Sequence, residues 1–294
     1  MKRFKGTGVA IVTPFKNDLS IDFAALGRVI KHVIDGGVNY IVALGTTGES
    51  VTITKDEKKA VISYVAEAID GHVPLVVGIG GNNTQEIINS IRQTKLTGVD
   101  GILSVAPYYN KPTQRGLFQH FKAIATCSPL PLIIYNVPGR TSCNVSADTC
   151  LELAHECDNI VAVKEASGDM TQIMKIIKGK PENFNVISGD DMLTIPIIAA
   201  GGTGVISVLG NAFPAQCTEI VSNALKNNFK TARETQFRFL EMIELLFIEG
   251  NPAGVKAMMN IMNLCNNTLR LPLVTVSRST YSRIQKAIEE INRK

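Results

Sequence analysis

The sequence lacks the short motifs that mark several large enzyme classes. It contains neither HExxH nor GxSxG, its four histidines are dispersed, and no group of carboxylates has metal-ligand spacing. These absences disfavour metal-dependent hydrolysis and serine-type catalysis, and we expect no metal site. The six cysteines are widely spaced and include no CxxC pair, which favours buried free thiols over a disulfide or zinc framework.

Charge and hydrophobicity are those of an ordinary globular protein. Apolar residues make up 45% and charged residues 19% of the chain, and 30 basic against 26 acidic residues give a net charge of +4. The basic residues are spread along the chain, so nothing indicates a nucleic-acid partner. No apolar run follows the positive charges of residues 1–6, which argues against a signal peptide and predicts a cytoplasmic protein.

One stretch, residues 192–213, is uncharged and long enough to resemble a membrane span. Pro196, four glycines and Asn211 divide it into a helix-like piece and a strand-like piece. We therefore interpret it as buried core and expect no membrane partner.

A repeated pattern runs through the first two thirds of the chain. Short β-rich runs alternate with amphipathic segments of about a dozen residues, such as residues 23–35, as in consecutive βα units. The eight strand candidates are residues 8–13, 40–44, 73–80, 101–106, 132–137, 160–166, 184–188 and 204–209. Several are nearly continuous apolar runs, which is typical of parallel strands covered on both faces.

Two architectures fit this pattern, an open doubly wound sheet and a closed barrel. Eight units of similar length without a visible edge strand favour the α/β class with a (β/α)8 TIM barrel. Residues 214–294 read as three or more helices, with Asn251 as a helix cap and Pro252 in the first turn. We divide the chain into a barrel of residues 1–225 and a C-terminal helical extension of residues 226–294.

In a closed parallel barrel the site lies at the carboxyl ends of the strands. Lys164 directly follows an apolar run, at a position where burial should disfavour the charged ammonium form. The neutral amine is a nucleophile and can form a Schiff base with a carbonyl substrate. The alternative is a structural ion pair with Glu165, although adjacent strand residues point to opposite faces. Tyr135 ends the preceding strand and could move protons for Lys164, or could simply be a core residue with its hydroxyl at the rim.

Three further strand ends carry polar groups. The loop from Gly45 to Gly48 offers N–H groups and two hydroxyls, enough to hold a carboxylate, but it lacks the lysine of a P-loop. Arg140 follows a Pro-Gly turn and could bind a second carboxylate, or could be a solvated surface residue. Asp190 and Asp191 could line the site, but we favour capping of the next helix.

These segments together resemble one enzyme family over essentially the whole chain. The motifs that carry the resemblance are Gly45-Thr46-Thr47-Gly48-Glu49-Ser50, Pro107-Tyr108-Tyr109-Asn110, Tyr135-Asn136-Val137-Pro138-Gly139-Arg140-Thr141, Val163-Lys164-Glu165-Ala166, Ser188-Gly189-Asp190-Asp191 and Asn251-Pro252. They are similar to the dihydrodipicolinate synthase family of the N-acetylneuraminate lyase superfamily. The resemblance implies a lyase that condenses pyruvate with L-aspartate 4-semialdehyde in lysine and diaminopimelate biosynthesis.

The resemblance also assigns roles to residues. It implies that Lys164 forms the pyruvate imine, that Tyr135 donates and accepts protons, and that Thr47 links Tyr135 to Tyr109 of a neighbouring subunit. It implies a homotetramer, a dimer of dimers, and no cofactor beyond the covalent imine. The substrate-binding residues that it implies are Thr46, Thr47, Arg140, Gly189 and Ile206.

The family has an effector pocket for lysine, and this chain differs from lysine-sensitive members at one position of that pocket. Its positions correspond to Ser50, Val51, Lys55, Lys58, Asn82, Glu86 and Tyr108. Lysine-sensitive members commonly carry histidine where this chain has Lys58, and a second cation should repel the ammonium of the effector. We therefore predict weak or absent inhibition by lysine.

Two other functions remain open. One is a binding or regulatory barrel that has lost the chemistry, which is disfavoured by the joint presence of Lys164, Tyr135, Thr47, Tyr109 and Arg140. The other is a sister aldolase or dehydratase acting on N-acetylneuraminate or 2-keto-3-deoxy sugar acids, which has less need for a carboxylate clamp at Arg140.

Overall fold

The computed structural model describes residues 4–293 and contains a closed barrel of eight parallel strands in sequential order. Residues 1–3, part of the basic start discussed above, lie outside the described range. The strands are β1 (Gly6–Ala10), β2 (Tyr40–Ala43), β3 (Leu75–Gly78), β4 (Gly101–Val105), β5 (Leu132–Asn136), β6 (Ile160–Glu165), β7 (Asn185–Ser188) and β8 (Gly204–Ser207). The predicted (β/α)8 barrel is therefore confirmed.

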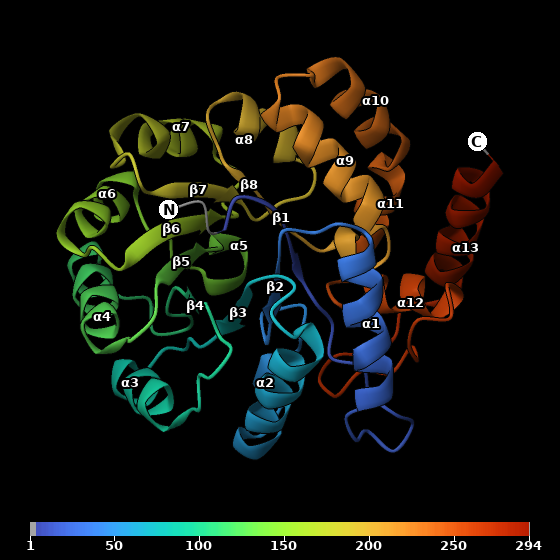
Figure 1. Cartoon of the computed structure of the whole chain (residues 1–294), viewed down its shortest axis with the longest axis horizontal. Coiled ribbons are helices and arrows are strands. Elements are labelled where there is room, and N and C mark those ends of the chain that lie inside the picture. The colour runs from blue at the N-terminus through green and yellow to red at the C-terminus, as the bar shows by residue number, and fades with distance from the viewer. Residues whose placement is uncertain (1–3, 294) are drawn as a thin grey trace.

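Helices cover the outside of the barrel and continue beyond it (Figure 1). Those up to the eighth strand are α1 (Phe23–Asp35), α2 (Lys55–Ile69), α3 (Thr84–Gln93), α4 (Gln114–Cys127), α5 (Pro138–Thr141), α6 (Ala147–Glu156), α7 (Met170–Gly179) and α8 (Thr194–Ala199), with the 3-10 turn η1 (Ser50–Thr52). After β8 come the 3-10 turn η2 (Leu209–Asn211) and the helices α9 (Pro214–Leu225), α10 (Phe229–Arg238), α11 (Leu240–Phe247), α12 (Ala253–Ile261) and α13 (Arg278–Arg293).

The barrel interior is filled by side chains from alternating strand positions. Tyr40, Leu103, Ile133, Ile187 and Ile206 belong to one buried cluster. At the seam that closes the barrel, Gly204 pairs with Gly6 in parallel register. A Cβ on Gly204 would lie 1.9 Å from the Gly6 carbonyl oxygen, so this seam requires glycine.

The first strand begins and ends earlier than its apolar pattern predicts. The Ile11 N–H still donates to the Val42 carbonyl of β2 at 3.0 Å, and residues 12 and 13 then leave the ladder and form a buried connection. There the N–H of Val12 donates to Asn211 Oδ1 at 3.0 Å, and the Thr13 hydroxyl donates to the Gly48 carbonyl at 2.8 Å. Apolar residues in a buried connection give the same signal as a buried strand, which explains the shift in β1.

The uncharged stretch of residues 192–213 is core, as predicted, and forms α8, β8 and η2. Within residues 4–293 no helix combines the length and the apolar character needed to cross a bilayer. The six cysteines are free thiols, five of them buried.

The C-terminal helices gather on one side of the barrel, next to α1 and α9 (Figure 1). α9 packs against both β1 and α10, so barrel and extension are continuous in space. The division at residues 225 and 226 stays a prediction.

Candidate active site

Lys164 and Tyr135 lie side by side at the carboxyl ends of β6 and β5. They are partners in the strand register, and the Lys164 Nζ atom lies 4.2 Å from the centre of the Tyr135 ring. Lys164 is only 5% exposed, and no carboxylate among residues 4–293 forms an ion pair with it. The amine is thus buried over the face of an aromatic ring and has no carboxylate counter-ion in the described chain.

Glu165 points away from Lys164, so the ion pair considered as an alternative does not form. Its carboxylate accepts hydrogen bonds from Asn136 Nδ2 at 2.6 Å and Gln172 Nε2 at 2.7 Å. The N–H and hydroxyl of Ser167 donate to the other carboxylate oxygen at 3.0 and 2.6 Å. Alternation along β6 therefore separates the buried carboxylate from the buried amine.

Gly189 makes room for the Lys164 side chain. Its N–H donates to the Glu165 carbonyl at 2.7 Å, continuing the ladder beyond β7. A Cβ at this position would lie 3.0 Å from Lys164 Cε and 2.7 Å from Ala166 Cβ. The space beside the Lys164 side chain therefore requires glycine at position 189.

The loop after β2 brings Thr46 and Thr47 to the same end of the barrel. Two turn hydrogen bonds shape it, from Gly48 N–H to the Gly45 carbonyl and from Glu49 N–H to the Thr46 carbonyl, both at 3.1 Å. Thr47 is buried and Thr46 is half-buried. Within residues 4–293 neither threonine N–H donates to a protein acceptor, so both remain available to an anion.

Contacts from the far C-terminal part of the chain hold this loop, and no pattern in the sequence predicts them. Glu49 forms a fully buried ion pair with Lys256 of α12 and accepts the N–H of Arg270 at 3.3 Å. Lys256 Nζ also donates to the Thr268 carbonyl at 2.9 Å and lies 4.2 Å from the centre of the Phe15 ring. The extension therefore fixes the position of the loop.

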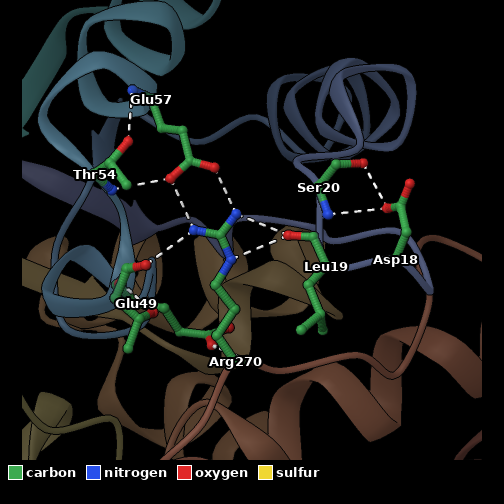
Figure 2. A network of polar contacts seen from close by, with 8 residues as sticks. Asp18, Leu19, Ser20, Glu49, Thr54, Glu57 and Arg270 are labelled. Atoms are coloured by element: carbon green, nitrogen blue, oxygen red, sulfur yellow. Dashed lines mark hydrogen bonds and ion pairs between the residues drawn. The ribbon is translucent and has the colours of Figure 1, made fainter.

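Arg270 adds a second anchor for the segment that follows β2 (Figure 2). Its guanidinium donates to both carboxylate oxygens of Glu57, at 2.8 and 2.5 Å. These bonds lower the pKa of Glu57 to about 2. The same guanidinium donates to the carbonyls of Leu19 and Thr52, both within 2.9 Å. Arg270 thus joins the β1–α1 connection, η1 and α2 to the C-terminal segment.

Asn251 does not cap α12, so that prediction is wrong. Pro252 occupies the N-cap position, and the Asn251 Nδ2 group instead donates to the Thr47 hydroxyl at 3.0 Å. The two residues are 204 positions apart. The Asn-Pro pattern indicated a helix start correctly, but nothing local to it pointed to a contact at the barrel mouth.

Asp190 and Asp191 do not cap the following helix either. The N-cap of α8 is Leu193, without a side-chain hydrogen bond. Asp191 is buried and accepts hydrogen bonds from the Ser207 hydroxyl at 2.5 Å and from the Val208 N–H at 2.9 Å. Burial raises its pKa, and the carboxylate holds the turn that follows Ile206 on β8.

Arg140 lies on the short helix α5 and is exposed. No carboxylate in the described part of the chain forms an ion pair with it, so its guanidinium is available to an external anion. The segment after it is held by a hydrogen bond that the Val145 N–H donates to Asn136 Oδ1 at 2.9 Å.

Tyr109 does not join the other site residues within one chain. Its side chain is 89% exposed, and its backbone has a φ of +73°. The neighbouring connection is ordered by Asn82 Nδ2, which donates to the Tyr108 carbonyl at 3.1 Å. The aromatic ring of Tyr109 is thus presented to the outside of the chain.

The residues of the expected effector pocket lie on η1, on α2 and α3, and on the loops beside them. Lys55 and Lys58 both belong to the first turns of α2, and Val51 is exposed. Burial lowers the pKa of Lys58, and the charge of Lys55 lowers it further. These two cations already repel one another.

Comparison with known proteins agrees with this geometry. The sequence model of the Dihydrodipicolinate synthetase family matches residues 3–291. The chain belongs to this family. It is therefore an enzyme, a lyase of the Schiff-base aldolase type that uses no external cofactor.

Members of the dihydrodipicolinate synthetase family resemble the chain over nearly its full length. The 4-hydroxy-tetrahydrodipicolinate synthase of Parabacteroides distasonis is 49% identical over 98% of this chain and 97% of its own. The crystal structure of dihydrodipicolinate synthase from Aquifex aeolicus has a TM-score of 0.95 and 42% identity, covering 98% of each chain. The Acinetobacter baumannii enzyme, solved in complex with pyruvate, has a TM-score of 0.95 and 37% identity, covering 98% of this chain and 99% of that one.

Proposed function

We propose that this enzyme condenses pyruvate with L-aspartate 4-semialdehyde through an imine on Lys164. The observation that carries the proposal is the buried amine of Lys164, without a counter-ion in the described chain, 4.2 Å from the centre of the Tyr135 ring. The family's name supports the reaction, and the pyruvate complex of the Acinetobacter baumannii relative supports the first substrate. No external cofactor is needed, because the protonated imine nitrogen itself accepts electron density.

The chemistry follows from the amine and the phenol. The Lys164 amine attacks the ketone carbon of pyruvate, and loss of water gives the imine. The imine acidifies the pyruvate methyl group, and removal of a proton gives an enamine whose carbon attacks the aldehyde. The Tyr135 hydroxyl supplies and removes protons in these steps, because its ring already lies against the amine.

The pyruvate carboxylate binds at the loop after β2. Within residues 4–293 the N–H groups and hydroxyls of Thr46 and Thr47 donate to no protein acceptor, and the Thr47 hydroxyl accepts one hydrogen bond, from Asn251 Nδ2. The Ile206 carbonyl borders the imine from β8, and Gly189 leaves the space beside Lys164 open.

Arg140 binds the carboxylate of the semialdehyde. Its guanidinium is exposed and has no ion-pair partner in the described chain, and its planar fork matches a carboxylate. This residue also distinguishes the proposed substrate from the sugar-acid substrates of the sister lyases, which have less need for a second carboxylate clamp.

The exposed ring of Tyr109 supports assembly of the enzyme. In the proposed relay Thr47 connects Tyr135 to Tyr109 of a neighbouring subunit, which requires at least a dimer with the two barrel mouths close together. The outward position of Tyr109 suits that role. We propose a homotetramer, built as a dimer of dimers, that works in the cytoplasm in the synthesis of diaminopimelate and lysine.

Inhibition by lysine is expected to be weak or absent. The pocket residues Asn82, Glu86 and Tyr108 suit an amino-acid ligand, but Lys58 presents a cation beside Lys55. The ammonium of a lysine effector would meet both charges. Titration of lysine into the enzyme assay tests this, and strong inhibition at sub-millimolar lysine would contradict it.

Borohydride reduction in the presence of pyruvate tests the proposed chemistry. We expect covalent trapping of pyruvate on Lys164, located by mass spectrometry of the peptide, and no trapping in Lys164→Arg. A binding barrel without catalysis would not be trapped. Turnover of pyruvate with aspartate semialdehyde, N-acetylmannosamine or a sugar aldehyde then decides the second substrate, and a preference for either of the last two would refute the proposed reaction.

A further inference from the structure

The segment that carries Arg140 leaves β5 at Asn136 and returns to the same residue. It begins with the short helix α5, where the Arg140 N–H donates to the Val137 carbonyl at 2.9 Å. Nine residues after Asn136, the Val145 N–H donates to the Asn136 Oδ1 atom at 2.9 Å. Asn136 therefore fixes both ends of this segment, residues 137–145, which we call the arginine loop.

The Arg140 side chain has no polar contact that would hold it in place. Within residues 4–293 its guanidinium forms no ion pair and no hydrogen bond. The position of the guanidinium therefore depends on the backbone of the arginine loop. Besides Asn136, that backbone is held by Gln114 of α4, whose Nε2 group donates to the Asn144 carbonyl at 2.8 Å.

The orientation of the Asn136 amide is imposed by Glu165. Asn136 is 0% exposed, and its Nδ2 group donates to Glu165 Oε1 at 2.6 Å and to Asn144 Oδ1 at 2.8 Å. A carboxylate surrounded by donors can only accept, so the NH2 side of the amide must face Glu165 and the oxygen must face the Val145 N–H. Turning the amide around would set its oxygen against the carboxylate and its NH2 group against the Val145 N–H, in a fully buried site.

This polar pair lies directly beside the reacting pair but on the other face of the strands. In the register of β5 and β6, Asn136 is the partner of Glu165. The residues before them, Tyr135 and Lys164, are partners in the same register. Tyr135 belongs to the cluster in the barrel interior, whereas Glu165 accepts a hydrogen bond from Gln172 of α7 on the outside. Alternation along the strands therefore keeps Asn136 and Glu165 away from the amine and the phenol.

We propose that Asn136, held in one orientation by Glu165, is a positioning residue that places Arg140 for the carboxylate of the second substrate. The proposal rests on the function proposed above, in which Arg140 binds the carboxylate of the semialdehyde. The hydrogen bond from the Val145 N–H closes the arginine loop, and the closed loop sets the reach of the guanidinium. Asn136 thereby acts on selectivity for an acidic aldehyde and not on formation of the imine.

Asn136→Ala removes the acceptor that closes the loop and adds no charge. We expect kcat/KM for the semialdehyde to fall by at least about 10-fold, because the arginine loop is no longer held at its far end. Borohydride trapping of pyruvate reports imine formation, and exchange of the pyruvate methyl protons in D2O reports enamine formation. Both rates should stay within about 2-fold of wild type, because Lys164 and Tyr135 lie on the other face of the strands.

A double-mutant cycle with Arg140→Ala separates positioning from a general structural loss. If Asn136 acts through Arg140, the guanidinium that it places is already absent from Arg140→Ala. Adding Asn136→Ala to that variant should then lower kcat/KM for the semialdehyde by less than about 2-fold. A general loosening of the barrel mouth would instead multiply the two losses.

Moving the carboxylate from one side of the pair to the other tests the imposed orientation. Asn136→Asp alone sets two carboxylates against each other across a contact that measures 2.6 Å in the wild type, so it should lower semialdehyde kcat/KM more than Asn136→Ala does. In the double variant Asn136→Asp with Glu165→Gln, the new carboxylate accepts both the Val145 N–H and the new amide. The side-chain amides of Asn144 and Gln172 can turn to match. We expect this variant to recover kcat/KM to within about 5-fold of wild type.

Asn159→Asp is the matched control at the opposite end of β6. Asn159 is half-buried, and its Nδ2 group donates to the Ala125 carbonyl at 2.8 Å, so the exchange again replaces a donor by an acceptor. We expect a lower melting temperature and an unchanged kcat/KM for the semialdehyde. A loss of kcat/KM as large as that of Asn136→Asp would show that the effect is not specific to the arginine loop.

The positioning role is refuted by a wild-type kcat/KM for the semialdehyde in folded Asn136→Ala, by losses that multiply in the cycle, or by pyruvate trapping that falls in step with semialdehyde turnover. If Asn136→Ala does not fold, the double variant Asn136→Asp with Glu165→Gln decides, and a loss as large as that of Arg140→Ala would contradict the proposal. Absence of pyruvate trapping in the wild-type enzyme would instead refute the proposed function itself.

Discussion

The buried ion pair between Glu49 and Lys256 should make a large contribution to folding that a single substitution reveals. Both side chains are 0% exposed, and they join the loop after β2 to α12. Each charge has one further polar contact, from the Arg270 N–H to Glu49 and from Lys256 to the Thr268 carbonyl. Removing either partner would therefore leave the other charge buried and poorly compensated.

The change Lys256→Met keeps most of the side-chain volume and removes the cation. Loss of one partner of a buried pair typically costs about 3–5 kcal/mol of unfolding free energy. For 294 residues the entropy of unfolding is about 0.6 kcal/mol per kelvin, so the melting temperature should fall by about 5–8 °C. The pyruvate KM should rise as well, because the Thr46 and Thr47 loop loses an anchor.

Calorimetry at one protein concentration measures the effect, since association also shifts the melting temperature. The double variant Glu49→Gln with Lys256→Met should recover much of the loss, because it leaves no unpaired charge. As a matched control, Lys31→Met breaks the exposed pair with Asp35, whose side chains are 76% and 60% exposed, and should cost less than about 1 kcal/mol. The reasoning is refuted if Lys256→Met melts within about 1 °C of wild type, or if the two substitutions are additive.

Three other variants test separate parts of the structure. Glu57→Gln should cost about 1–2 kcal/mol at pH 7. Because the pKa of Glu57 is lowered from 4.5 to about 2, this stability is present above pH 4.5 and is lost as the pH falls toward 2. Urea unfolding at several pH values should show the gap between variant and wild type closing in that window, and a constant gap would contradict the assignment to Arg270. Gly189→Ala places a Cβ 3.0 Å from Lys164 Cε, so kcat and pyruvate trapping should fall at least about 10-fold; normal trapping rates would show that the amine needs no such space. Arg140→Ala should lower kcat/KM for the semialdehyde by about 100-fold and leave pyruvate trapping intact, whereas an equal loss for both substrates would place Arg140 elsewhere in the reaction.

Much of the fold could be predicted from periodicity. All eight strands were found where apolar runs predict them, because strands covered on both faces by helices must be apolar along their length. The helix from Phe23 to Asp35 was predicted with its observed bounds. The displaced bounds of β1 had no local signal, since residues 11–13 are as buried as a strand but lie beyond the last register pair of β1 with β2.

The polar residues around the site were harder to predict. Asp191 and Asn251 are of residue types that commonly cap helices, yet both form hydrogen bonds with groups on other segments. A cap is a local interaction within a few residues, and local rules cannot reveal that a distant donor or acceptor competes for the same side chain.

The sequence by itself determined the barrel and the meeting of Lys164 with Tyr135, because consecutive parallel strands in a closed barrel bring neighbouring strand ends together. Only the tertiary structure decided how the loop with Thr47 is held. Its anchors Asn251, Lys256 and Arg270 follow it by more than 200 residues, and their contacts depend on where the C-terminal helices pack. Periodicity records which face of an element is buried, but it does not record which distant segment that face will meet.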